Sequence, residues 1–403
     1  MGAPPRELLR RDGGKIVLLV MDGLGGLPDP QHGKTEMEAA SLPHLDALAA
    51  RSSTGRAQIL DPYLTPGSGP GHLSLFGYDP QRIDFGRGLL EALGSDYPLA
   101  AGEVAARGNF CTIDAAGLVQ DRRAGRPPDA ECKRLCEKLT QHVQLDDADF
   151  VLLPGKQHRF TLVVRGNGLG HHINDNDPQV EGKPPHPFAG RDAASEKTAA
   201  LVTSFFEQAR QCLRDEPQGS GVLLRGFSSM PDIESYDERY ALRAAVIAIY
   251  PMYRGVARLV GMNVLDPGTS LPEQIAVAQR EWDNYDFFFL HTKDPDTAGH
   301  SGDFAAKVSA LEAIDQHIPQ LEALLGTGDD NVLIITGDHS TPTIHREHSW
   351  HPVPLILQSQ RCIPMPTPFH ERGVMGGDLG TFSAQDLMGL ALAHAGRLDK
   401  FGA

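Results

Sequence analysis

Three short apolar runs, each followed within two residues by aspartate or histidine, constrain the fold of this 403-residue chain most strongly. They are Ile16–Met21, Asp286–Leu290 and Asn331–Thr336, and a fourth apolar run follows at Val353–Leu357. Such continuous apolar character is typical of strands that are buried on both faces of a parallel sheet. Between the runs, helical patterns begin after Thr35, with an interruption at Pro43, and recur at 234–262 (broken at Pro251), 272–282, 305–325 and 384–395. The alternation predicts an α/β fold with a mainly parallel sheet flanked by helices.

The middle of the chain has a different pattern. Shorter strand-like runs at 108–113, 150–153, 160–165 and 221–225 surround one clear helical stretch, 195–213. This pattern predicts an α+β domain inserted into the first domain. We expect the core domain to comprise residues 1–101 and 229–403, and the inserted domain to comprise residues 102–228.

The chain is acidic, with 37 Lys and Arg against 52 Asp and Glu and a formal net charge of −15. Nucleic acid and anionic membranes are therefore poor candidate partners, since both attract basic surfaces. The apolar runs are far shorter than the roughly 20 residues that span a bilayer. Five scattered cysteines and an N-terminus without an apolar signal segment predict a cytoplasmic protein without a disulfide framework.

Polar residues that follow the apolar runs are candidate ligands, because ligands of open α/β sheets collect at the carboxyl ends of strands. Asp22 follows the first run directly, although it also suits a plain Asp-Gly turn. After the second run, Asp294-Pro295 is typical of a helix start. Asp296 and His300 would then share one helical face, with an exposed Asp–His hydrogen bond as the alternative.

Asp338 and His339 follow the third run and His348 lies nine residues beyond His339, where a plain loop is the alternative. The strand-end residues together supply six nitrogen and oxygen ligands: Asp22, Asp296, His300, Asp338, His339 and His348. Split three and three, they would satisfy a pair of divalent cations.

Ser68 lies in a glycine-rich segment, Thr65–Leu75, directly before a helical stretch. Glycines permit close approach of a ligand, and a helix N-terminus offers free N–H groups to an anion. Ser68 is therefore a candidate nucleophile toward a phosphoryl group, and a simple helix cap is the alternative. A Gly-x-Ser-x-Gly hydrolase turn is a poor match, because Pro66 and Pro70 occupy the glycine positions.

The inserted segment concentrates positive charge. The candidate substrate ligands are those of its arginines that lie in the 121–126 segment or on or beside other predicted strands, namely Arg122, Arg123, Arg126, Arg159 and Arg225. Guanidinium groups bind carboxylate and phosphate bidentately, so these side chains are candidate substrate ligands. A solvated surface run is the alternative.

These motifs resemble the cofactor-independent phosphoglycerate mutases of the archaeal type, bacterial members included, within the alkaline phosphatase superfamily. The resemblance runs nearly end to end, and its most specific segments are GSGPGH at 67–72 and DRRAGR at 121–126. It implies a metal-binding, alkaline-phosphatase-like core and an inserted domain that grips glycerate. The implied activity is isomerisation of 3-phosphoglycerate and 2-phosphoglycerate, in glycolysis or gluconeogenesis, through a phosphoserine.

The resemblance also implies residue roles. Ser68 would be the phosphorylated nucleophile. One cation would be held by Asp22, Ser68, Asp338 and His339, and the other by Asp296, His300 and His348. Mn²⁺ is favoured, Mg²⁺, Zn²⁺ and Co²⁺ are alternatives, and 2,3-bisphosphoglycerate is not needed. Arg243 stands where relatives commonly carry a lysine that supports the phosphoserine, so we expect it to be catalytic.

Two other functions remain open at this stage. A metal-dependent phosphatase or phosphodiesterase of the same superfamily would use the same metal chemistry but would not trap glycerate. A non-catalytic sensor of phosphorylated ligands is the second alternative, and the intact Ser68 and six ligands argue against it. The expected partner is a small phosphoglycerate, with no nucleic acid or membrane, and a homo-oligomer is left open.

Overall fold

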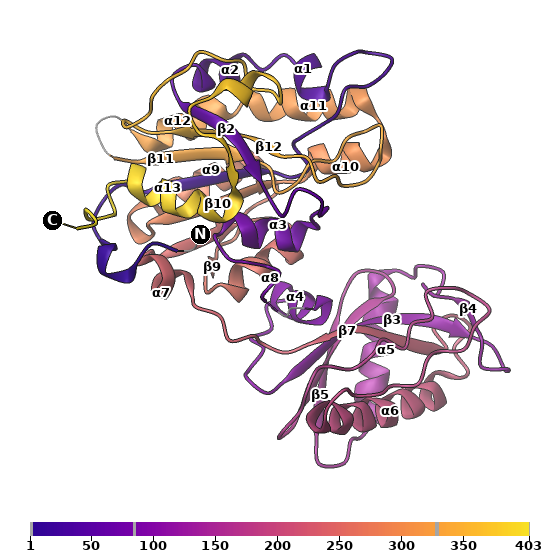
Figure 1. Ribbon diagram of the computed structural model, residues 1–403. Helices are drawn as coiled ribbons and strands as arrows, with labels where there is room; N and C mark the ends of the chain where they lie inside the picture. The colour runs from indigo at the N-terminus through magenta and orange to yellow at the C-terminus, as the bar shows by residue number, and fades with distance from the viewer. Residues whose placement is uncertain (1–2, 84–85, 327–329, 403) are drawn as a thin grey trace. The chain divides into compact units, whose positions relative to one another are not determined.

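A computed structural model describes residues 3–83, 86–326 and 330–402 and divides the chain into two compact units (Figure 1). Unit 1 consists of Met1–Arg82 and Glu234–Ala403, and unit 2 consists of Ile83–Ile233. Our sequence-based boundaries, at 101/102 and 228/229, make unit 2 shorter. The difference arises because α4 (Arg87–Gly94) packs on strands β3 and β7 of unit 2.

Unit 1 is built on an eight-stranded sheet in the order β13-β2-β12-β11-β1-β10-β8-β9. Only β12 runs antiparallel to its neighbours, so the sheet is mainly parallel and the expected fold class is confirmed. The strands are β1 (Ile16–Met21), β2 (Ser53–Gln58), β8 (Ala244–Ile247), β9 (Asn263–Val264), β10 (Phe287–Thr292), β11 (Val332–Thr336), β12 (Val353–Gln358) and β13 (Gly380–Ser383).

The three apolar runs of the sequence form the adjacent strands β11, β1 and β10, and every residue of these strands is buried. Their register is parallel, since Val20 of β1 lies opposite His291 of β10 and Thr336 of β11. The segments that follow the three strands therefore leave the sheet at the same edge. This edge carries the candidate site.

The helices of unit 1 cover both faces of this sheet, as the side chains of β10 show. Phe288 stacks on Trp282, which follows α9, whereas Phe289 and His291 contact His72 of α3 on the other face. The helices are α1 (Glu36–Ala39), α2 (Pro43–Ala49), α3 (Ser68–Leu75), α7 (Tyr236–Tyr240), α8 (Pro251–Leu259), α9 (Leu271–Arg280), α10 (Asp294–Ser301), α11 (Phe304–Asp315), α12 (Ile318–Leu325) and α13 (Leu387–His394). Four 3₁₀ turns lie at Arg6–Leu8, Trp282–Asn284, Gly373–Gly376 and Ala384–Asp386.

The helix expected over 234–262 is wrong in its middle part. Helix α7 ends at Tyr240, the following residue Ala241 has a left-handed φ of 56°, and strand β8 begins at Ala244 beside β10. The four residues of β8, Ala-Ala-Val-Ile, are all buried. A buried run this short has no periodicity that separates strand from helix, and pairing with β10 decides the outcome. The second part, from Pro251, is helical as expected.

Unit 2 is an antiparallel sheet with helices against it. Strands follow the order β4-β3-β6-β5, and β7 pairs with β3. Helices α5 and α6 pack against each other and the apolar face of the sheet, and α5 was not predicted from the sequence. The elements are β3 (Val104–Ile113), β4 (Val119–Asp121), β5 (Asp149–Pro154), β6 (Arg159–Arg165), β7 (Gly221–Ser228), α5 (Asp129–His142) and α6 (Ala193–Leu213). Within the described part of the chain, no helix is both long and apolar enough to cross a membrane.

Candidate active site

Three of the predicted ligands meet where β1 and β11 end, and we call Asp22, Asp338 and His339 the first cluster. Their ligand atoms lie within 4.8 Å of one another, and all three side chains are fully buried. Nε2 of His339 lies 3.4 Å from Oδ1 of Asp22 and 3.2 Å from Oδ2 of Asp338. These two carboxylate oxygens are buried and have no hydrogen-bond partner among the described residues. Since an unpaired buried carboxylate oxygen is costly, the first cluster fits a cation.

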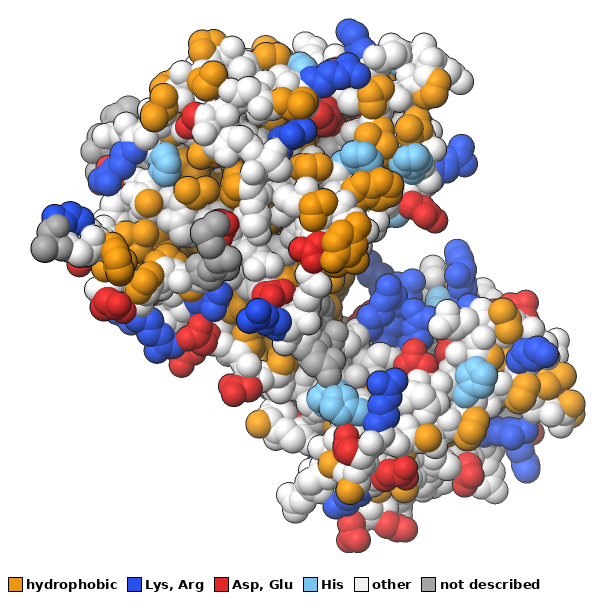
Figure 2. Space-filling model, viewed as in Figure 1, with side chains coloured by type: hydrophobic (Ala, Val, Ile, Leu, Met, Phe, Trp, Pro, Cys, Tyr) orange, Lys and Arg blue, Asp and Glu red, His pale blue; other side chains and the backbone are white. Residues whose placement is uncertain are grey.

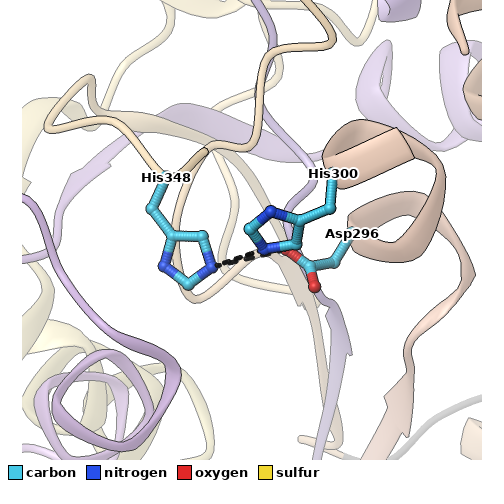
Figure 3. A group of neighbouring side chains, drawn as sticks. All are labelled: Asp296, His300 and His348. Atoms are coloured by element: carbon cyan, nitrogen blue, oxygen red, sulfur yellow. Dashed lines mark hydrogen bonds and ion pairs between the residues drawn. The ribbon is translucent and has the colours of Figure 1, made fainter. Parts of the chain in front are cut away.

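The other three ligands form the second cluster, Asp296, His300 and His348 (Figure 3). Asp296 and His300 lie one turn apart on α10, as the sequence predicted, and His348 comes from the loop between β11 and β12. Oδ1 of Asp296 is 3.5 Å from Nε2 of His300 and 3.6 Å from Nε2 of His348. The two Nε2 atoms are only 3.1 Å apart.

The second nitrogen of each histidine ring has its own partner. Nδ1 of His300 lies 2.8 Å from the carbonyl of Arg346, and Nδ1 of His348 lies 2.9 Å from the carbonyl of Pro66. A carbonyl only accepts, so Nδ1 carries the hydrogen in both rings and the Nε2 atoms of the neutral rings present lone pairs. This is the arrangement that outer partners impose on metal-binding histidines. The donor set and its orientation fit a divalent cation in each cluster.

Lys293, which the sequence analysis missed, lies between the two clusters. Its Nζ is 2.9 Å from Oδ2 of Asp22 and 2.6 Å from Oδ2 of Asp296. Burial disfavours the charged amine, yet these two carboxylates raise the pKa of Lys293 above its usual value. A signal existed in the sequence, because Lys293 follows the second apolar run within three residues, as Asp22 and Asp338 follow the first and third.

Tyr253 and His291 were also missed, and both orient Asp22. The Tyr253 hydroxyl donates to Oδ2 of Asp22, and Nε2 of His291 lies 3.0 Å from the same oxygen. With Lys293, these donors occupy Oδ2 and leave Oδ1 for the centre of the first cluster. Burial opposes ionisation of Asp22, but His291, His339 and Lys293 hold its pKa well below the usual range.

Ser68 is the first residue of α3 and does not act as its cap. The N-cap is Gly67, and no side chain caps the helix. Oγ of Ser68 instead lies 3.1 Å from Nε2 of His339, at the first cluster. The approach of α3 depends on Gly71, because a Cβ atom there would lie 2.4 Å from the carbonyl oxygen of Asp338. Gly71 thus allows α3 to bring the Ser68 hydroxyl to the ligands.

The structure does not bring Arg243 to this site, which corrects our expectation that it is catalytic. Its Nε lies 2.9 Å from Oδ2 of Asp286, and both residues precede their strands, β8 and β10. Arg243 is therefore at the amino edge of the sheet, whereas both clusters are at the carboxyl edge. A strand of this length separates the two edges by roughly 15–20 Å. Its role is to pair with Asp286.

The arginines predicted to bind substrate lie in unit 2, where Lys and Arg side chains gather on the surface (Figure 2). Arg122 forms a bidentate pair with Asp177, at 2.9 and 2.6 Å, and Arg225 reaches the same carboxylate at 3.5 Å. Arg123 and Arg126 are exposed in the loop after β4, and Arg159 is exposed at the start of β6. Arg126 has a left-handed φ of 55°, a strained backbone of the kind that clusters at ligand sites.

Sequence reasoning missed the buried part of this arginine group. On β3, Arg107 pairs with Thr161 and Arg225 on either side, and Asn109 pairs with Arg159 and Leu223. Both point away from the apolar face, and their alternation with Ala106 and Phe110 was a readable signal. Nε of Arg107, Oδ1 of Asn109 and Nδ1 of His158 are buried with no hydrogen-bond partner in the described part of the chain.

The pKa values of Arg107 and His158 show that positive charges crowd together in this part of unit 2. Burial and the neighbouring Arg159, Arg87 and Arg225 lower the pKa of Arg107 to about 10, with Glu91 acting in the opposite direction. Burial and the same kind of arginine neighbours lower the pKa of His158 to about 4. An anion placed among these side chains would relieve their mutual repulsion and satisfy the buried donors. These side chains of unit 2 therefore form a candidate anion site.

Comparison with known proteins gives a consistent result. The family model for 2,3-bisphosphoglycerate-independent phosphoglycerate mutase matches residues 49–219. A probable 2,3-bisphosphoglycerate-independent phosphoglycerate mutase of Thermus thermophilus is 46% identical over 403 residues, covering 99% of this chain and 98% of its own length. One of the same name from Thermotoga neapolitana is 45% identical over 399 residues, 98% of each chain.

Solved structures agree with the sequence comparison. The cofactor-independent phosphoglycerate mutase of Thermoplasma acidophilum matches with a TM-score of 0.73 and 28% identity, covering 94% of this chain and 100% of that protein. Similarity at this level over nearly the whole length shows the family. The chain belongs to the 2,3-bisphosphoglycerate-independent phosphoglycerate mutases.

Proposed function

We propose that this protein interconverts 3-phosphoglycerate and 2-phosphoglycerate without 2,3-bisphosphoglycerate, with Ser68 as the group that carries the phosphoryl between the two positions. The observation that supports this most directly is the position of Ser68, whose Oγ is 3.1 Å from Nε2 of His339 and is not used as a helix cap. Family membership over the full length supports the same reaction. We place the protein in the cytoplasm, consistent with its five free cysteines.

The proposal includes two divalent cations. Mn²⁺ is the preferred ion, and Mg²⁺, Zn²⁺ and Co²⁺ are the alternatives. Asp22, Ser68, Asp338 and His339 would hold one, and Asp296, His300 and His348 would hold the other. Such cations polarise phosphoryl oxygens and lower the pKa of a hydroxyl.

The chain's own residues supply position and charge. In the first half-reaction Ser68 Oγ loses its proton and bonds to phosphorus, the bond from phosphorus to O3 of the glycerate breaks, and O3 takes up a proton. In the second half-reaction O2 of the glycerate loses its proton and bonds to phosphorus, the bond from phosphorus to Ser68 Oγ breaks, and Oγ takes up a proton. Protons and phosphoryl groups therefore balance over the two steps, and no water is consumed. Lys293 and Tyr253 hold Asp22 in place throughout, through its Oδ2. The N-terminus of α3 presents backbone N–H groups at Ser68.

The arginine group of unit 2 would bind the carboxylate of the glycerate. Support comes from Nε of Arg107, a donor that is buried with no hydrogen-bond partner among the described residues, and from the lowered pKa of Arg107. A mutase differs from a phosphatase in that it retains glycerate between the half-reactions. Binding of the glycerate carboxylate by these arginines would provide that retention.

The direct test follows 3-phosphoglycerate by ³¹P NMR with the purified protein, Mn²⁺ and no bisphosphoglycerate. We expect 2-phosphoglycerate to accumulate to a constant ratio. In H₂¹⁸O the phosphoryl oxygens should acquire no label, since water takes no part. Release of inorganic phosphate in place of the isomer would instead establish a hydrolase.

Arg126 allows a test in which stability and substrate binding change in opposite directions. Arg126→Gly should raise KM about 10- to 100-fold, the loss of one charged hydrogen bond, because the guanidinium is gone. The same change should stabilise the protein by about 0.5–1 kcal/mol, because glycine adopts φ 55° without strain. Arg126→Ala, which keeps the strained backbone, should share the KM effect without the gain. Steady-state kinetics and urea unfolding measure both, and unchanged KM in both variants would remove Arg126 from the substrate site.

A further inference from the structure

The hydroxyl group of Thr341 lies between the two clusters and contacts one ligand of each. Oγ1 is 2.7 Å from Oδ1 of Asp296, in the second cluster, and 3.1 Å from Nδ1 of His339, in the first. Thr341 is fully buried. It is not one of the predicted ligands, and the reaction proposed above does not use it.

The chemistry of a hydroxyl assigns the direction of both hydrogen bonds. An ionised carboxylate only accepts, so the single hydrogen of Thr341 is donated to Asp296. Oγ1 must then accept from His339, which requires that Nδ1 of His339 carries the hydrogen. The lone pair of that ring is consequently on Nε2, the atom that faces Asp22, Asp338 and Ser68.

Thr341 is itself held tightly. Its N–H donates to the carbonyl of Gly25 at 3.0 Å, and its own carbonyl accepts from the buried Nζ of Lys307 at 2.8 Å. Lys307 also donates to Gly25, at 2.9 Å. Helix α10 packs so closely that a Cβ atom at Gly299 would lie 2.4 Å from the Thr341 carbonyl oxygen. The hydroxyl therefore has little freedom to move away from either ligand.

We propose that Thr341 is a positioning residue shared by the two cation sites, which orients Asp296 in one and fixes the ring hydrogen of His339 in the other. This inference rests on the two-cation site of the proposed function. Because one hydroxyl contacts a ligand of each site, its loss should weaken the binding of both cations. Outer partners of metal ligands typically contribute 10- to 100-fold to affinity.

The test is calorimetric titration of the full chain with Mn²⁺, without substrate, so that the measurement does not depend on turnover. Thr341→Val removes the hydroxyl at nearly constant shape, and both dissociation constants should rise by about 10- to 100-fold. Thr341→Ser keeps the hydroxyl and should restore most of the affinity at both sites. ¹⁵N NMR of His339 should report hydrogen on Nδ1 in the wild type and a mixture of tautomers in Thr341→Val.

Thr343→Val is the matched control. Thr343 is also buried and in the same loop, but its hydroxyl donates to Glu36, 2.6 Å away, and contacts neither cluster. This variant should lose stability and keep both Mn²⁺ affinities, which separates positioning from folding. If Thr341→Val does not fold, the pair Thr341→Ala and Thr341→Ser isolates the same hydroxyl.

The outcomes distinguish this inference from the proposed function. A wild-type protein that binds fewer than two Mn²⁺ would contradict the two-cation site itself. The role of Thr341 would be overturned if the wild type binds two Mn²⁺ and the Mn²⁺ affinities of Thr341→Val equal those of Thr343→Val at both sites. A loss confined to one site would also overturn it, since the shared hydroxyl must affect both.

Discussion

Ser68→Ala is expected to abolish phosphoryl transfer and leave two cations bound. The variant removes the oxygen that must bond to phosphorus, and removal of a nucleophile costs at least about 10⁴-fold in kcat. The first cluster keeps Asp22, Asp338 and His339, which surround the same point without Ser68. Mutase rate and Mn²⁺ titration of the same sample measure the two halves of this prediction.

The control for Ser68→Ala lies on the same helix. Ser74 is fully buried in α3, and its hydroxyl has no hydrogen-bond partner among the described residues. Ser74→Ala should therefore change neither rate nor stability by much, since no bond is lost. Turnover by Ser68→Ala within tenfold of the wild type would mean that another group carries the phosphoryl.

Removal of divalent cations with a chelator should abolish activity and lower the melting temperature, and Mn²⁺ should restore both. Without cations, Oδ1 of Asp22 and Oδ2 of Asp338 stay buried with no hydrogen-bond partner in the described part of the chain. At a cation concentration of 100 Kd, binding stabilises the folded protein by about 2.7 kcal/mol per site, or about 5 °C. Differential scanning calorimetry with and without chelator measures the shift.

Asp338→Asn provides the comparison for the chelator experiment. The amide reduces the negative charge of the first cluster, so a chelator should lower the melting temperature of this variant less than that of the wild type. Full activity in excess chelator, with an unchanged melting temperature, would show that the two clusters do not hold the cations that the reaction needs.

The sequence identified the candidate ligands that the structure brings together because their signal is local. Asp22 and Asp338 follow buried strands directly or after one residue, and parallel strands end at one edge, so the fold class alone places both at that edge. Asp296 and His300 needed only a helix start at Asp294. These residues could be found without knowing which strand pairs with which.

The remaining residues depend on pairing and packing. Thr341 is chemically ordinary in the sequence and becomes informative only when α10 and the loop after β11 are side by side. The alternation around Arg107 could be read from the sequence, but that Arg107 lies between Thr161 and Arg225 needed the register of β3 with β6 and β7. The expectation for Arg243 came from the resemblance alone, and the structure does not place Arg243 beside the ligands. Once Ala244–Ile247 is a strand, Arg243 precedes it and must lie at the edge opposite the ligands.

The sheet order also has a consequence for how the chain is made. Strand β1, near the N-terminus, is completed only by β10 and β11, which lie beyond residue 286. All strand pairs of unit 2 fall within residues 104–228, so its sheet can form before β10 and β11, the neighbours of β1, have been synthesised. During synthesis, unit 2 should therefore become protease-resistant before unit 1. A nascent chain that is released before His348 leaves the ribosome should contain a folded unit 2 but should lack one ligand of the second cluster.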